Sequence, residues 1–147
     1  MGNADEVKGM NLLKRAAQKG DIEARILYIE RMLNEVTRCS EDDFIELHKY
    51  CRELIAKDEE LPEPYYFLGI MYENGYAVPS KPKIALLYYS VAAEYRSEAA
   101  FLKLGDCYKN GFGIEQDAKE AIRCYEQVAK TNPLALVYLG YFFDNFR

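Results

Sequence analysis

A recurring Leu-Gly pair constrains the fold of this chain more than any other feature. The pair occurs at Leu68-Gly69, Leu104-Gly105 and Leu139-Gly140, so the glycines lie 36 and then 35 residues apart. A fixed spacing in this range is typical of helical hairpins that stack one on the next. The spacing therefore predicts a repeat array, and it favours a binding scaffold over an enzyme.

Apolar residues recur at helical spacing along the whole chain. Val7, Met10 and Leu13, for example, would form one buried stripe, and no segment shows the alternation of a β-strand. We therefore predict an all-α chain of about eight helices. Their expected ranges are Asp5–Lys19, Asp21 to about Arg38, Ser40 to about Ile55, Pro64–Glu73, Pro82–Tyr95, Ser97–Lys109, Asp117–Lys130 and Pro133 to the C-terminus.

Local signals mark the ends of these helices. Gly20 supplies a left-handed stop and Asp21 a cap for the next helix, while Ser40 and Asp43 have the spacing of a capping box. Gly residues that follow Asn74 and Asn110 are further stops. Because the connections are short, consecutive helices should lie antiparallel.

The clearest unit resembles the Sel-1-like repeat family, which is related to the tetratricopeptide repeats. The resemblance rests on Ala100, Leu104, Gly105, Tyr108, Gly111, Gly113, Ile114, Asp117, Ala121 and Tyr125. The preceding unit matches at most of the same positions, but Ala77 replaces the second glycine. The resemblance implies a solenoid of antiparallel helical hairpins, wound as a right-handed α/α superhelix.

We expect one repeat domain over residues 1–147. It would comprise degenerate repeats over 5–61, regular repeats over 62–96 and 97–131, and a terminal half repeat over 132–147. In the degenerate part Ile29 takes the place of the Leu-Gly glycine. The array would then start with a lone second helix and end with a lone first helix.

Four asparagines stand five residues after the glycine position of their unit: Asn34, Asn74, Asn110 and Asn145. By analogy with tetratricopeptide repeats, first helices line a concave groove, so the amides would form a ladder that bonds the backbone of a partner. Asn before Gly is also a common helix stop, which is the alternative for Asn74 and Asn110. Asn34 and Asn145 lack a following Gly and test the ladder better.

The same analogy assigns other side chains to the groove. Those expected there are Tyr66, Ile70, Glu73, Leu102, Asp106, Lys109, Val137, Tyr141 and Asp144. The chain has 13 tyrosines and no tryptophan, and phenolic side chains provide contact area and a hydroxyl at low entropic cost. Tyr72, Tyr89, Tyr108 and Tyr125 occupy packing positions of the repeat, and we expect them in the core.

Charge and composition restrict the partners. A net charge of −5, with basic residues scattered among acidic ones, argues against nucleic acid. No apolar run is long enough for membrane insertion, and the first residues lack the features of a signal peptide. We therefore expect a cytoplasmic protein that binds a protein or peptide partner.

Catalytic motifs are missing from the sequence. His48 is the only histidine, and with Cys51 it supplies too few ligands for a metal site. We expect no catalytic residue, metal or cofactor, and we expect Cys107 and Cys124 to face each other as packed thiols more readily than as a bridge. The alternative is a small helical enzyme or ligand-binding protein, similar to the β-lactam-binding, cysteine-rich branch of the family, whose paired cysteines this chain lacks.

The last helix is rich in large apolar residues and has no following helix to cover it. Leu136, Leu139, Phe142, Phe143 and Phe146 all lie in this segment. We expect partial exposure there and a possible homodimer through this aromatic helix.

Overall fold

The computed structural model describes residues 4–145, apart from the side chain of Asn145. In this part of the chain there are eight α-helices, one short 3-10 helix and no strand, as the sequence predicts. The helices are α1 (Ala4–Gln18), α2 (Ile22–Asn34), η1 (Val36–Arg38), α3 (Glu41–Lys57), α4 (Pro62–Asn74), α5 (Pro82–Glu94), α6 (Glu98–Asn110), α7 (Ala118–Val128) and α8 (Pro133–Asn145).

Among the helix boundaries that differ from the sequence prediction, two have a clear local cause. Helix α2 ends at Asn34 because Glu35 leaves the helical conformation, and Val36–Arg38 form a separate 3-10 turn. Helix α4 begins at Pro62 rather than Pro64. Proline suits the first helical turn because its missing N–H has no partner to lose there.

The expected caps are present. The Asp21 side chain accepts a hydrogen bond from Ala24 N, and Ser40 and Asp43 form a capping box. Gly75 and Gly111 end α4 and α6 in the left-handed conformation. Ala77 also has a positive φ of 62°, so the backbone keeps the turn although the residue is not glycine.

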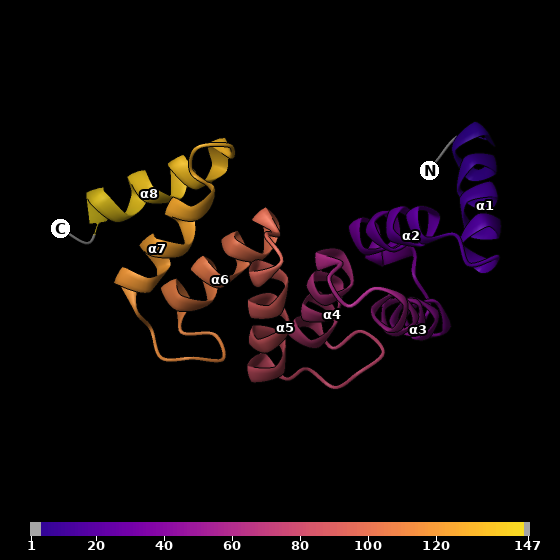
Figure 1. Ribbon diagram of the computed structural model, residues 1–147, viewed down its shortest axis with the longest axis horizontal. Helices are drawn as coiled ribbons and strands as arrows, with labels where there is room; N and C mark the ends of the chain where they lie inside the picture. The colour runs from indigo at the N-terminus through magenta and orange to yellow at the C-terminus, as the bar shows by residue number, and fades with distance from the viewer. Residues whose placement is uncertain (1–3, 146–147) are drawn as a thin grey trace.

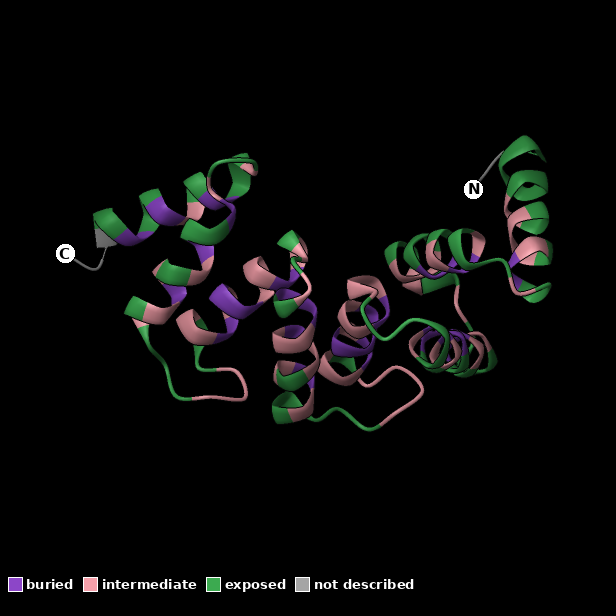
Figure 2. Ribbon diagram, viewed as in Figure 1, coloured by how far each residue is buried: buried purple, intermediate pink, exposed green. Residues whose placement is uncertain are grey.

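The helices form a right-handed superhelical array in which each packs on its neighbours in the chain. The closest pairs are α4 with α5 and α6 with α7, and the array continues through contacts such as α5 with α6 and α7 with α8. Figure 1 shows the pairs following one another along an arc, with α1 and α8 at its opposite ends. The buried residues lie on the sides of the helices that face another helix (Figure 2).

Glycine and tyrosine form the seam inside each regular pair. The ring of Tyr89 on α5 lies against Gly69 on α4, and the ring of Tyr125 on α7 lies against Gly105 on α6. Both rings are completely buried. Because glycine has no side chain, the tyrosine ring can lie directly on the opposing helix. In the degenerate part Ile29 occupies this position, and α2 and α3 pack less closely.

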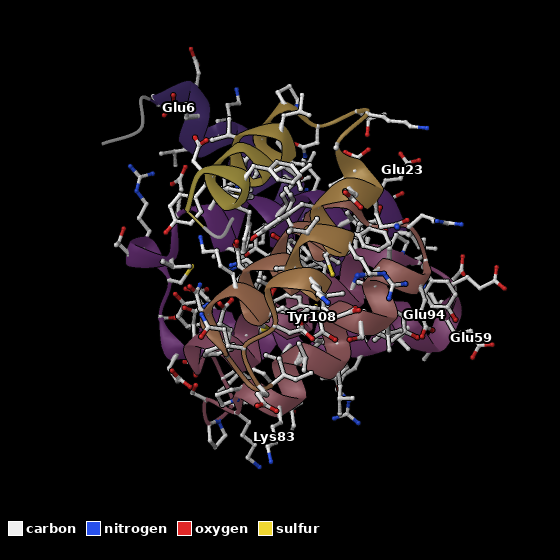
Figure 3. The ribbon with its side chains drawn as sticks, turned by 90° about the vertical axis from the view of Figure 1, so that its left-hand side faces the viewer. Glu6, Glu23, Glu59, Lys83, Glu94 and Tyr108 are labelled. Carbon is white, nitrogen blue, oxygen red and sulfur yellow. The ribbon has the colours of Figure 1, made fainter. Side chains whose placement is uncertain are left out.

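Charged side chains cover the outside of the array. Viewed from its end, Glu23, Glu59, Lys83 and Glu94 point away from the helices (Figure 3). Tyr108 is half-buried, as is Tyr72, whereas Tyr89 and Tyr125 are fully buried as expected.

Candidate binding groove

The first helices of successive pairs, α2, α4 and the start of α6, surround a cavity of about 370 Å³. Three of the predicted groove residues line it: Asn34 at the end of α2, and Tyr66 and Ile70 on α4. Asn34 belongs to one helix pair, and Tyr66 and Ile70 belong to the next. The repeat spacing predicts that they occupy equivalent faces, and the fold brings their side chains to one cavity. This cavity is the centre of the candidate site, which we call the groove.

An ion pair connects neighbouring units beside the cavity. Glu73 on α4 accepts a hydrogen bond from the hydroxyl of Tyr89 at 2.6 Å and pairs with Lys103 Nζ on α6 at 3.2 Å. Burial alone would lower the pKa of Lys103, but the carboxylate of Glu73 raises it overall. The ion pair between Glu73 and Lys103 therefore links α4 to α6.

Tyr66 lies in an environment of mixed charge. Burial raises the pKa of its hydroxyl; Lys103 opposes the rise, and Glu73 and Glu30 add to it. Its ring contacts that of Tyr89 at a centroid distance of 5.9 Å. Tyr66 is thus half-buried, and its aromatic ring lines the cavity.

Asp106 has a partner within its own repeat. It accepts a hydrogen bond from the Tyr125 hydroxyl at 2.6 Å. Burial, and then this bond to Asp106, raise the pKa of Tyr125. The position predicted for partner contact therefore also holds the seam tyrosine.

Lys109 and Tyr141 meet at the C-terminal end. The Lys109 ammonium lies 5.1 Å from the centre of the Tyr141 ring and 5.7 Å from that of Tyr138. Such contacts are favourable because the ring face is electron-rich. Tyr141 keeps 48% of its surface exposed, so the cluster leaves an aromatic surface open.

The asparagines occupy equivalent places but differ in their bonding. Asn34, Asn74, Asn110 and Asn145 are each the last residue of their helix. The Asn74 amide donates to Ile70 O in its own helix at 2.9 Å, while Asn34 lines the cavity and Asn110 is exposed. The side chain of Asn145 lies outside the described part. The ladder stays a prediction, and Asn34 is the member best placed for it.

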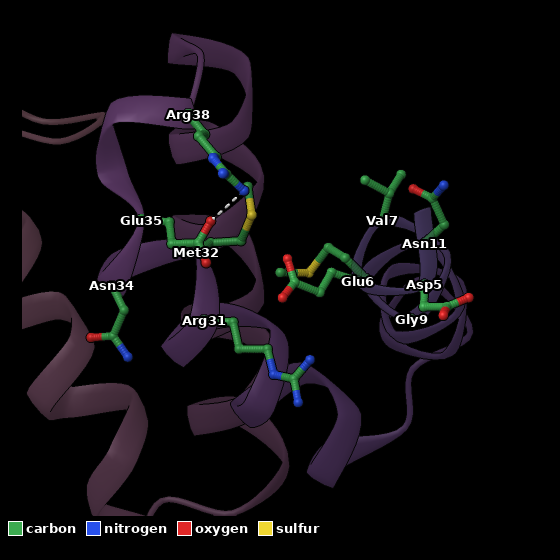
Figure 4. A pocket seen from close by; sticks show the side chains of 11 residues that line it. Asp5, Glu6, Val7, Gly9, Asn11, Arg31, Met32, Asn34, Glu35 and Arg38 are labelled. Carbon is green, nitrogen blue, oxygen red and sulfur yellow. Dashed lines mark ion pairs between the residues drawn. The ribbon is translucent and has the colours of Figure 1, made fainter. Parts of the chain in front are cut away.

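A larger cavity of about 770 Å³ lies between α1 and the end of α2 (Figure 4). Its walls carry charges of both signs, among them Asp5, Arg31 and the ion pair of Glu35 with Arg38. Sequence patterns gave no sign of this cavity.

His48 and the cysteines lie partly or fully buried among packed side chains. The His48 ring stands edge-on to Tyr72, and Cys51 is fully buried. Within residues 4–145 no group of three or more His, Cys, Asp or Glu side chains could hold a metal ion. All four cysteines are free, and burial raises the pKa of Cys107 and of Cys124 to about 11.

The aromatic face of α8 is partly exposed, as the sequence predicts. Leu139 and Phe142 are buried, whereas Leu136 and Phe143 are 57% and 52% exposed. Phe146 lies outside the described residues. The homodimer through this face stays a prediction. None of the helices between residues 4 and 145 combines the length and apolar character needed to cross a membrane.

The sequence analysis did not identify four charged residues that line the cavity or form ion pairs between helices. Glu30 and Glu63 line the cavity, and Lys103 pairs across units. Arg25 is 8% exposed; it donates to Ala17 O at 2.9 Å and pairs with Glu53 at 2.7 Å. Of these four, only Arg25 could have been recognised as buried from the sequence. It lies three residues before Tyr28 and four before Ile29, so it shares their buried face of α2.

The fold and the groove define an α-solenoid built from stacked helical hairpins. The chain belongs to the Sel1 repeat family, whose model matches residues 2–21, 65–94 and 99–130, together more than half of the chain. This confirms the resemblance drawn from the Leu-Gly units. Sel1 repeat proteins generally mediate protein–protein interactions and are generally non-catalytic scaffolds.

Similar proteins agree with this assignment. A candidate ERAD-associated E3 ubiquitin-protein ligase component of Schizosaccharomyces pombe is 32% identical over 58% of this chain, which spans 12% of that relative. The c5321 antigen of uropathogenic Escherichia coli shares the fold with a TM-score of 0.78 at 20% identity, covering 99% of this chain and 30% of that one. Cysteine-rich protein B of Helicobacter pylori has a TM-score of 0.66 at 25% identity, covering 88% and 96%.

Proposed function

We propose that this chain is a non-catalytic scaffold of the cytoplasm that binds a peptide or protein segment in the groove formed by α2, α4 and α6. The observation that carries the proposal is the cavity at the junction of these three helices, lined by Asn34, Tyr66 and Ile70. Its walls come from three consecutive pairs, so a ligand there would contact more than one unit of the array. Extended binding along successive units is how repeat scaffolds recognise partners.

Side-chain chemistry also suits a peptide. Tyr66 and Ile70 supply apolar contact area, and Asn34 supplies an amide that can both donate to and accept from a peptide backbone. Further along, Lys109 and the exposed Tyr141 extend the polar and aromatic surface. The groove would thus bind through several modest contacts.

The test is to select binders from a random peptide library and to measure their affinity by fluorescence polarisation. The double variant Tyr66→Ala/Ile70→Ser should weaken binding at least tenfold, since both side chains line the cavity. The matched control is Leu87→Ser on α5, where Leu87 is 64% exposed and lies outside the cavity. Circular dichroism verifies that each variant is folded.

Equal affinity of the selected peptides for the wild type and the folded groove variant would refute the proposal. Loss of binding in the Leu87→Ser control would also refute it, because the contact surface would then lie on α5. A further variant, Asn34→Ala, tests the amide ladder separately: unchanged affinity would remove Asn34 from the contact set.

A further inference from the structure

We propose that the groove cavity holds a lysine or arginine side chain of the bound segment, with the aliphatic stem between α2 and α4 and the cationic group at Glu63. This inference rests on the proposed function and names the chemistry of its partner.

The walls of the cavity are apolar on two sides. Ile26 and Leu33 line it from α2, and Phe67 and Ile70 line it from α4. Its volume of about 370 Å³ corresponds to roughly a dozen water molecules at about 30 Å³ each. A long unbranched side chain can lie between such walls while its polar end reaches a charged group.

The charge inside the cavity has one sign. Glu30 and Glu63 are the ionisable acids that line it, and among the described lining residues none is basic. The nearby Lys103 already pairs with Glu73. A cation entering the cavity would therefore meet net negative charge without a competing internal partner.

Glu63 provides the second, independent observation. No residue in the described part of the chain donates a hydrogen bond to its buried Oε2 atom. A buried carboxylate oxygen without a donor is unfavourable, so the Glu63 side chain would recover that cost by turning its carboxylate toward a cation in the cavity. The N-terminus of α6 does not supply it: the Ser97 side chain accepts from Ala100 N, and Ser97 N donates to Ala92 O.

The experiment uses a minimal probe, N-acetyl-arginine N-methylamide, followed by NMR on the methyl groups of Ile26 and Ile70. The matched probes are the lysine analogue and the neutral citrulline analogue, which keeps the shape of arginine but not its charge. The arginine or lysine probe should shift both methyl groups, and the citrulline probe should bind about tenfold more weakly, because a hydrogen bond to a charged group is lost.

Two protein variants complete the test. Glu63→Gln should weaken the cationic probe about tenfold, while Glu23→Gln, at an exposed position on α2 outside the cavity, should not change it. Equal binding of arginine and citrulline probes, or an unchanged affinity in Glu63→Gln, would overturn the proposal. Methyl shifts elsewhere but not at Ile26 and Ile70 would overturn it as well.

Failure of this inference is distinguishable from failure of the scaffold. If library peptides bind the groove without a basic residue and the arginine probe causes no shift, the cavity proposal is overturned and the scaffold stands. If the probe binds at Glu63 but no selected peptide depends on Tyr66 and Ile70, the peptide groove is refuted, and only the affinity of the cavity for a cation stands.

Discussion

Replacing the seam glycines by alanine tests the packing frame, and the chain contains its own control. A methyl group at position 69 would lie 2.5 Å from Cδ1 of Tyr89, and one at position 105 would lie 2.7 Å from Cδ1 of Tyr125, with the Cε1 atoms closer still. At Gly140, the equivalent glycine of α8, nothing lies within 4 Å. The same substitution should therefore have opposite effects at positions 69 and 140.

The magnitude follows from what the Tyr89 ring would have to do. The ring is completely buried, and its hydroxyl is bonded to Glu73, so it cannot turn away freely. Overpacking costs about 1–3 kcal/mol, and weakening a hydrogen bond to a charged group costs roughly 1 kcal/mol more. Alanine recovers about 0.5–1 kcal/mol through its better helix propensity. We expect Gly69→Ala to destabilise the protein by about 1–3.5 kcal/mol net.

The expected result for Gly140→Ala is a gain of about 0.5–1 kcal/mol, because the position is helical and exposed. Thermal unfolding followed by circular dichroism measures both variants, and a loss of about 1–3.5 kcal/mol corresponds to a fall of roughly 2–14 °C in Tm at this chain length. The packing argument would be refuted if Gly69→Ala kept the wild-type Tm, or if Gly140→Ala lowered it by as much as Gly69→Ala.

Three further substitutions test features of the frame. Arg25→Met should destabilise by about 2 kcal/mol, since it removes the bonds to Ala17 O and Glu53, whereas Arg31→Met at an exposed position of α2 should stay near wild type in urea unfolding. Burial, and then Arg52, lower the pKa of His48 below 6.5, so the unfolded chain takes up the proton first and stability falls as pH drops below about 6.5; His48→Gln should flatten the slope between pH 5 and 7, and an unchanged slope would contradict the shift. Arg96 is exposed with a φ of 70°, and Arg96→Gly should raise the stability by about 0.5–1 kcal/mol; a lower Tm would show that its side chain contributes.

The sequence predicts the frame of this protein because the frame depends on short-range patterns. Gly69 and Tyr89 belong to one hairpin, and their spacing repeats at Gly105 and Tyr125. Caps such as that of Asp21 depend on residues three positions apart. Each of these signals can be recognised without knowing how the units curve.

The groove was predictable only in part. Tyr66 and Ile70 follow from their place in the repeat, but the pairing of Glu73 with Lys103 joins residues 30 positions apart on different units. The partner-free oxygen of Glu63 depends on how α2 and α4 converge, and the spacing between these helices is irregular. Asn74 occupies the position that the repeat predicts for partner contact, but its amide donates to Ile70 O in its own helix. Position in the repeat alone therefore does not predict which side chains are available to a partner.

The seam tyrosines also constrain which side chains the first helices can carry. Tyr89 and Tyr125 reach past the glycines, and their hydroxyls end at carboxylates on the first helices, Glu73 and Asp106. The buried tyrosines thus favour a hydrogen-bond acceptor at positions 73 and 106 of the first helices. A change of side chain at either position would therefore alter the packing of the repeat as well as the surface of the first helices.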